Sequence, residues 1–343
     1  MREITMQTRI RIRNEVLQRL CCPICHSKLE LVSDCLKCLN PQCKASFPIV
    51  DGIPILINES SSLFNIEDFV HHRSTTYQSI SQRGLLGKIE QLARKLLPEI
   101  SHNIKARQIF SKFAELLLEQ NENPMVLILG GSIVGQGLKS ILSLSSIQFV
   151  ETDVSFGPRT VLVCDAHDIP FEDGTLDGVI VQGVLEHVAA PDRCVEEIHR
   201  VLKDEGLVYA ETPFMQQVHW GKYDFTRFTY LGHRRLFRKF SEVCSGAVAG
   251  PGMVLAWSYQ YFFLSLTKAK LARKLIKAFA MLSSFWLKYF DYILIDKPGT
   301  LDAASSYYLI ARKSNQVLSD RELVGLYKGA DRELVDLHKD DWE

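Results

Sequence analysis

Residues 124–153, PMVLILGGSIVGQGLKSILSLSSIQFVETD, join two apolar runs through a glycine-rich turn, and the second run ends in an acid. Short apolar runs bounded by turn residues are typical of buried strands. The segment between them is long enough for a short helix. A strand, a helix and a second parallel strand form half of a nucleotide-binding unit, so the pattern predicts a parallel sheet with helices on its faces.

The same rhythm continues along the chain. VLVC runs into Asp165, LDGVIVQ runs into Gly183, and GLVYAE runs into Thr212. Because parallel strands end along one edge of a sheet, the residues after them line a common crevice. We therefore predict a doubly wound α/β fold that binds a nucleoside-containing ligand at this edge.

Length and charge set broad limits. With 343 residues, 46% of them hydrophobic, the chain can bury the core of one such domain and of smaller parts. Lysine plus arginine equals aspartate plus glutamate, 40 each, so no net charge attracts nucleic acid. The charged first residues lack the apolar stretch of a secretory signal, and we expect a cytoplasmic protein.

Six of the nine cysteines lie between residues 21 and 43. This clustering favours a metal site over a disulfide scaffold. One pair is separated by two residues and the next by four, spacings with which four thiolates complete a tetrahedral shell around a structural zinc ion. The predicted zinc ligands are Cys22, Cys25, Cys38 and Cys43. Cys35 with Cys38 is the alternative second pair, which we find less suitable because Asn40-Pro41 supplies a turn before Cys43.

The segment SFPIVDGIPILIN follows the cysteines. Together with the CPIC start, residues 20–58 resemble the zinc-ribbon module of the small partner protein of tRNA and protein methyltransferases. The resemblance implies a folding and docking module. A closed site of four cysteines leaves no position for water, so we expect this zinc to be structural.

The series VLILGG, ETDVS, CDAHDIPF, LDGVIVQGVLEHV and EIHRVLKDEGLVYAETPF resembles class I S-adenosylmethionine-dependent methyltransferases over about residues 124–240. The resemblance implies a seven-stranded, mostly parallel, Rossmann-like sheet with S-adenosylmethionine as cofactor. In this family glycines approach the methionine, and the resemblance implies Gly130, Gly131 and Gly135 for this role. It implies that Asp153 holds the ribose and that Asp165 and Ala166 contact the adenine. It also implies that Gln182 and Gly183 lie beneath the sulfonium. His187 is a further candidate contact.

The acceptor is expected after the strand that ends at Thr212, where the sequence continues PFMQQVHWGKYDFTRFTY. Methyltransferases of sugar and polysaccharide biosynthesis resemble this segment, which implies O-methylation of a small molecule or glycan precursor. We interpret His219 or Asp224 as the base, with Tyr223 and Arg227 orienting the substrate. A structural ion pair between Asp224 and Arg227 is the alternative. The alternative functions are an rRNA or tRNA methyltransferase whose ribbon docks RNA, and a non-catalytic scaffold.

Helical periodicity marks IEQLARKLL and ARQIFSKFAELLLEQ before the sheet, and a basic, aromatic stretch at about 258–296 after it. The latter is expected to cover the acceptor site or to contact an anionic membrane surface. We expect a ribbon module over 1–58, a linker and helical segment over 59–123, the methyltransferase domain over 124–313 with a helical insertion at about 258–296, and a tail over 314–343. Residues 305–312 are expected to finish the sheet.

Overall fold

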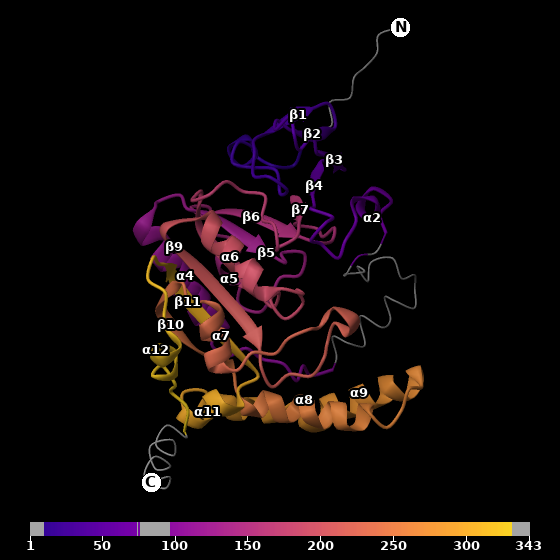
Figure 1. Ribbon diagram of the computed structural model, residues 1–343. Helices are drawn as coiled ribbons and strands as arrows, with labels where there is room; N and C mark the ends of the chain where they lie inside the picture. Colours follow the sequence, from indigo (N-terminus) through magenta and orange to yellow (C-terminus); the bar gives the residue numbers. More distant parts are fainter. Residues whose placement is uncertain (1–9, 74, 76–96, 331–343) are drawn as a thin grey trace, which may run out of the picture.

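The computed structural model describes residues 10–73, 75 and 97–330 (Figure 1). Its strands form one sheet in the order β1-β2-β3-β4-β7-β6-β5-β8-β9-β11-β10. Strands β5 to β9 are parallel, and β11 runs antiparallel to both β9 and β10. The bounds are Met125–Leu129 (β5), Gln148–Asp153 (β6), Leu162–Cys164 (β7), Leu176–Gln182 (β8), Leu202–Pro213 (β9), Phe240–Ala249 (β10) and Ser306–Lys313 (β11). The predicted seven-stranded, mostly parallel, doubly wound sheet is confirmed.

Strand order reverses at β5, which has β6 on one side and β8 on the other. The carboxyl ends of β5 and β8 therefore flank the crevice in which such sheets bind their ligands. The last strand that the sequence predicts, β11, is present and lies between β9 and the edge strand β10, which was not predicted. The glycine and alanines of its stretch, Phe240–Ala249, obscure the strand pattern.

Helices cover both faces of the sheet because alternate residues of β5 point in opposite directions. Leu127 and Leu129 lie in one core cluster with residues of α6, and Val126 and Ile128 lie in another with residues of α4. The two helices are α4 (Ala106–Gln120) and α6 (Pro191–Val201). Helix α4 confirms the periodicity of ARQIFSKFAELLLEQ, while IEQLARKLL falls almost entirely outside the described residues.

A loop separates β8 from the helix that follows it. Residues 183–190 form a loop, and α6 begins at Pro191. Gly183 has a φ of +65°, which breaks the chain direction at the strand end. Proline suits the first turn of a helix, where its missing amide hydrogen is not needed.

The cysteine-rich segment folds as a small antiparallel ribbon at one end of the molecule (Figure 1). Its elements are α1 (Asn14–Leu17), β1 (Leu29–Val32), β2 (Cys35–Cys38), β3 (Ser46–Val50) and β4 (Ile53–Leu56). Strand β4 pairs in parallel with β7, Ile55 opposite Val163 and Leu56 opposite Cys164. The ribbon thus extends the main sheet by direct strand pairing, which the sequence did not predict.

Helices α8 and α9 lie along the side of the molecule opposite the ribbon (Figure 1). The carboxylate of Asp291 accepts hydrogen bonds from the amides of Gly250, Gly252 and Met253, at 2.7–3.1 Å, and so fixes the start of α8. No helix among the described residues is both long and apolar enough to cross a membrane. The remaining helices are α2 (Ile66–Val70), α5 (Lys139–Leu142), η2 (Gly221–Tyr223), α7 (Tyr230–Leu236), α8 (Pro251–Leu264), α9 (Lys270–Ser284), η3 (Leu287–Phe290), α10 (Asp291–Leu294), α11 (Pro298–Ala303) and α12 (Asp320–Val324).

Candidate functional site

A cavity of about 230 Å³ lies at the carboxyl ends of β5, β6, β7 and β8. We call it the cofactor cavity. Of the residues expected to bind the cofactor, those on its lining are Gly130, Gly135, Asp153, Asp165, Ala166, Gln182, Gly183 and His187. Gly131 is not on the lining, and its amide donates to the Thr152 carbonyl at 2.8 Å. The structure thus brings all but one of these residues to a single cavity.

Two glycines keep the turn after β5 narrow. Gly130 has a φ of +73°, and a Cβ there would lie 2.5 Å from Val184 Cγ2. A Cβ on Gly135 would lie 2.1 Å from Gln182 Oε1. Side chains at either position would collide with residues that line the cofactor cavity, so glycine is needed for this tight turn.

Asp153 ends β6 and is buried. Its Oδ2 accepts hydrogen bonds from the Ser132 amide at 3.0 Å and the Ser132 hydroxyl at 2.6 Å, and its Oδ1 accepts from Ser155 at 2.8 Å. These bonds fix the carboxylate at the wall of the cofactor cavity. Ionised oxygens have room for further donors, such as a pair of ribose hydroxyls.

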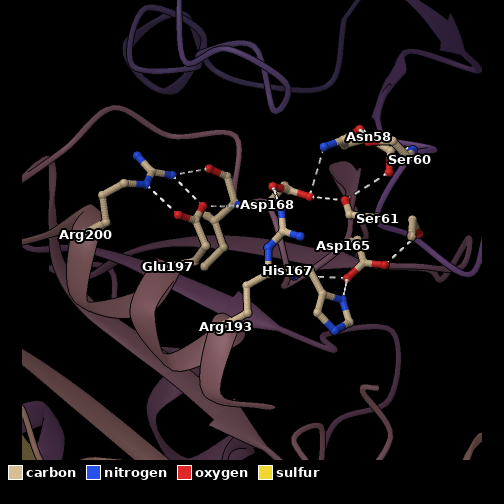
Figure 2. A network of polar contacts seen from close by, with 11 residues as sticks. Asn58, Ser60, Ser61, Asp165, His167, Asp168, Arg193, Glu197 and Arg200 are labelled. Carbon is tan, nitrogen blue, oxygen red and sulfur yellow. Dashed lines mark hydrogen bonds and ion pairs between the residues drawn. The ribbon is translucent and has the colours of Figure 1, made fainter. Parts of the chain in front are cut away.

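Asp165 follows β7 and belongs to a buried polar network (Figure 2). Its Oδ1 accepts from the amide of His167 at 3.0 Å and lies 2.6 Å from His167 Nδ1, and its Oδ2 accepts from Ser62 at 2.6 Å. Burial opposes ionisation of Asp165, but the hydrogen bonds and charge of His167 outweigh it and lower its pKa. The carboxylate therefore also holds the loop after β7 in place.

The segment after the ribbon forms part of this network, a contact that the sequence did not reveal. Asn58 donates to Asp168 at 3.2 Å, Ser61 donates to the same carboxylate, and Arg193 of α6 pairs with it (Figure 2). Leu63 and Phe64, directly after these serines, line the cofactor cavity. The expected linker thus supplies one apolar wall of the site.

The lining suits S-adenosylmethionine. Carboxylates can bind the ribose and amino groups, and apolar side chains such as Phe64, Ile133 and Val188 offer contacts for the adenine ring. Gln182 Oε1 is buried without a hydrogen-bond partner within the described part of the chain. This oxygen at the cavity floor can therefore accept a hydrogen bond from a ligand. These features fit the cofactor that the sequence predicts.

A second cavity, of about 270 Å³, adjoins the first and shares Gly135, Gln182 and Gly183 with it. We call it the acceptor cavity. Its lining includes Glu186 and His219, and Met253 reaches it from α8. A substrate here would lie beside the cavity floor at the end of β8. Direct transfer of a group between two bound molecules requires adjacent cavities, because the acceptor atom must approach the reacting carbon closely.

The loop after β9 carries the four residues proposed for catalysis, His219, Tyr223, Asp224 and Arg227. The Asp224 carboxylate is buried and bonded by both Nη atoms of Arg227, with Nη2–Oδ2 at 2.8 Å. It also accepts the His219 amide at 2.9 Å. Burial opposes ionisation of Asp224, but these bonds outweigh it and lower its pKa to about 2.

Arg227 also donates to the carbonyls of Gln216, Gln217 and Thr226, and its Nη2 lies 3.5 Å from His219 Nδ1. The geometry therefore matches the structural ion pair that the sequence left as an alternative. Tyr223 lines the cofactor cavity, with its ring 5.8 Å from that of Phe64. Substrate orientation by Tyr223 and Arg227 remains a prediction.

His187 and Glu186 from the loop after β8 meet His219 from the loop after β9. The imidazoles pack edge to face with centroids 4.9 Å apart, and Glu186 Oε1 lies 3.7 Å from His187 Nε2 and 3.9 Å from His219 Nε2. Burial raises the pKa of Glu186 to about 8, lowers that of His187 to about 4, and lowers that of His219. The sequence did not single out Glu186, because a glutamate after a strand carries no pattern of its own.

The four predicted zinc ligands come together in the ribbon. Cys22 and Cys43 have their sulfurs 3.8 Å apart, and Cys25 and Cys38 have theirs 3.4 Å apart. All four sulfurs lie within 4.8 Å of one another. Cys35 instead donates to the carbonyl of Val32 and lies outside the cluster.

Comparison with known proteins gives one match by sequence. Residues 141–210 match the family model described as a methyltransferase domain. No curated protein matches the chain.

Among solved structures, Haemonchus contortus phosphoethanolamine N-methyltransferase 2 is 16% identical, with 71% of this chain and 62% of that chain covered and a TM-score of 0.39. A chain of the complex containing the Haloferax volcanii Trm112 methyltransferase activator is 17% identical, with 64% and 99% covered and a TM-score of 0.37. A methyltransferase from Archaeoglobus fulgidus is 13% identical, with 60% and 94% covered and a TM-score of 0.36.

The family match spans β6, β7 and β8, whose carboxyl ends carry Asp153, Asp165 and Gln182 on the cofactor cavity. Because the matched segment is also the part of the sheet that forms this cavity, the protein is an S-adenosylmethionine-dependent methyltransferase.

Proposed function

We propose that the protein methylates a hydroxyl group of a small molecule or a glycan precursor. The acceptor cavity supports this, because it adjoins the cofactor cavity and has Glu186 and His219 on its wall. Bound S-adenosylmethionine supplies a methyl group on a sulfonium, and the carbon–sulfur bond breaks with its electron pair left on sulfur. A hydroxyl acceptor must also lose its proton, which requires a polar group beside it.

We assign activation of this hydroxyl to His219. Its Nδ1 lies 3.3 Å from the Gln217 carbonyl and 3.5 Å from Arg227 Nη2, and with its hydrogen on Nδ1 the ring would keep the Nε2 lone pair for a proton. Nε2 faces Glu186 at the acceptor cavity. Asp224 is a positioning residue, since Arg227 and the His219 amide already occupy its oxygens.

Replacement of His219 tests this assignment. We expect His219→Ala to lower turnover about 100-fold or more, in line with the contribution of a positioned proton-transfer group, with S-adenosylmethionine affinity unchanged. His72→Ala is a matched control, because the His72 side chain is exposed away from both cavities. Full turnover by His219→Ala would contradict the assignment.

The acceptor class is tested by a screen of the purified full-length protein. Labelled S-adenosylmethionine is supplied with sugar-nucleotide, lipid-linked glycan and RNA fractions, and base-stable label is sought in each. We expect label in a glycan or small-molecule fraction. Label in RNA, with binding that falls steeply with salt, would instead favour the rRNA or tRNA alternative.

We also propose that the ribbon binds a structural zinc ion. Zinc–sulfur bonds of about 2.3 Å in a tetrahedron require sulfurs about 3.8 Å apart. The measured 3.4 and 3.8 Å are close to this spacing. Four cysteines fill such a shell, so this zinc would support the fold and take no part in methyl transfer.

Helix α9 supports a further partner, an anionic lipid surface. Leu271, Leu275, Phe279 and Leu282 recur every three or four residues and are all more than half exposed. This spacing places them on one helix face. Residues 251–290 hold six basic and no acidic residues, and this composition matches interfacial helices that lie on anionic bilayers. The lipid contact would bring a lipid-linked acceptor close to the site, since α8 precedes α9 and bonds the loop after β9, which we call the acceptor loop. Tyr261 of α8 donates to the Val218 carbonyl in this loop.

A further inference from the structure

Two histidines and a glutamate at the acceptor cavity have the arrangement of a metal site. Glu186, His187 and His219 each offer one ligand atom, and these atoms lie within 4.8 Å of one another. Two imidazoles with one carboxylate are a ligand set that binds divalent transition metals and leaves further positions open. Ligands of one ion lie roughly 3 to 3.5 Å apart, so small rotations of the imidazoles would close the set.

The hydrogen bonds around the histidines direct the correct nitrogens to this point. His187 Nδ1 lies 2.8 Å from the Tyr223 carbonyl, and His219 Nδ1 lies 3.3 Å from the Gln217 carbonyl. A carbonyl only accepts, so a hydrogen on Nδ1 of each ring satisfies it and leaves the Nε2 lone pair toward Glu186; Arg227 Nη2 also lies 3.5 Å from His219 Nδ1. Histidines that bind metals characteristically donate their other ring hydrogen to such an acceptor.

Two buried atoms of this cluster lack hydrogen-bond partners within the described residues. Glu186 is 2% exposed, and its Oε2 has no hydrogen-bond partner within residues 10–73 and 97–330. His187 Nε2 is likewise buried without one in that part of the chain. Buried polar atoms without partners are costly, and a bound cation would satisfy both.

We propose that Glu186, His187 and His219 bind a divalent metal cation that activates the acceptor hydroxyl. This inference rests on the proposed function and gives His219 a definite role, that of a ligand in place of a free base. The cation lowers the pKa of the hydroxyl that it binds, so the proton passes to solvent water near neutral pH. The acceptor oxygen then forms its bond to the methyl carbon as the carbon–sulfur bond breaks.

Direct binding of Mn²⁺ to the full-length protein tests the site, because the thiolates of the ribbon favour softer ions. We expect calorimetry to show one Mn²⁺ site, with affinity reduced at least tenfold in His219→Ala and in Glu186→Gln. His72→Ala is the control and should bind as the unchanged protein does. If Glu186→Gln fails to fold, His219→Ala still tests the metal site. His219 lies in a surface loop, so its replacement leaves the core unchanged.

The outcomes separate this inference from the proposed function. Equal Mn²⁺ binding by all variants, or none by the unchanged protein, would overturn the metal site. Methylation of hydroxyl acceptors after chelation, with the ribbon zinc shown to be retained, would overturn it as well and leave the proposed function intact. Mn²⁺ binding lost in both variants, without transfer to any hydroxyl acceptor, would support the site and refute the function.

Discussion

At the residue scale, the site depends on carboxylates fixed before a ligand arrives. Asp153 is bonded to Ser132 and Ser155, and Asp165 to Ser62 and His167. Each carboxylate is thus held at the cofactor cavity by a neighbouring loop. Such fixed groups lose little conformational entropy on binding, which favours affinity.

We expect Asp153→Ala to weaken S-adenosylmethionine binding about tenfold to 100-fold. This corresponds to about 1.4–3 kcal/mol, the range for hydrogen bonds to a charged group. Calorimetric titration measures the change. Asp173→Ala is the matched control, because Asp173 is an exposed acid in a turn away from the cavity. Unchanged affinity in Asp153→Ala would remove this residue from the cofactor site.

The sequence predicted those site residues that stand at the end of a recognisable strand pattern. Asp153 and Asp165 end apolar strands and were identified from the sequence. Glu186 follows a glycine turn within a loop, and Ser62 lies in an apparent linker, so neither stood out. Their roles arise from contacts with residues distant along the chain, such as His219 and Asp165.

At the element scale, β4 joins the ribbon to the domain. It pairs with β7, and β7 leads directly into Asp165. Unfolding of the ribbon would therefore disturb the cofactor cavity in two ways. It would remove the partner strand of β7, and it would release the segment that carries Ser62 and Phe64. The ribbon acts as a structural support of the cofactor site.

Loss of the zinc should therefore weaken cofactor binding as well as stability. We expect Cys25→Ser to release zinc, to lower the melting temperature and to reduce S-adenosylmethionine affinity at least tenfold, since structural zinc contributes directly to folding. Elemental analysis, thermal unfolding and calorimetry measure these effects. Cys35→Ser is the control, because Cys35 lies outside the cluster, and should retain zinc. Zinc loss with undiminished cofactor affinity would show that the ribbon folds independently of the site.

At the scale of the whole molecule, the ribbon and helices α8 and α9 lie on opposite sides of the catalytic sheet (Figure 1). Helix α8 contacts the acceptor loop, with Gln217 donating to Ser258 at 3.2 Å, while α9 exposes its apolar row. One helix thus covers the loop, and the next presents the proposed lipid surface. The contacts of α8 are in line with the predicted cover, and the lipid contact of α9 stays a proposal.

We expect the protein to sediment with vesicles that contain anionic lipid and to bind neutral vesicles more weakly. Leu271→Ser with Leu275→Ser should weaken vesicle binding at least tenfold, since both side chains are exposed and their loss leaves the core intact. Leu31→Ser with Leu39→Ser in the ribbon is the matched control. Association of the protein with itself through Leu271 and Leu275, without vesicle binding, would assign the face to a second copy.

The sequence by itself indicated strands β5 to β9 and β11, the acids at the strand ends and the four clustered cysteines, because apolar periodicity, turns and residue spacing are local properties. Only the tertiary structure decided which residues form the acceptor cavity. Glu186 and His187 follow β8 and His219 follows β9, and the parallel pairing of these two strands brings them together. Contacts between separate loops depend on how the sheet assembles, and no local pattern records them.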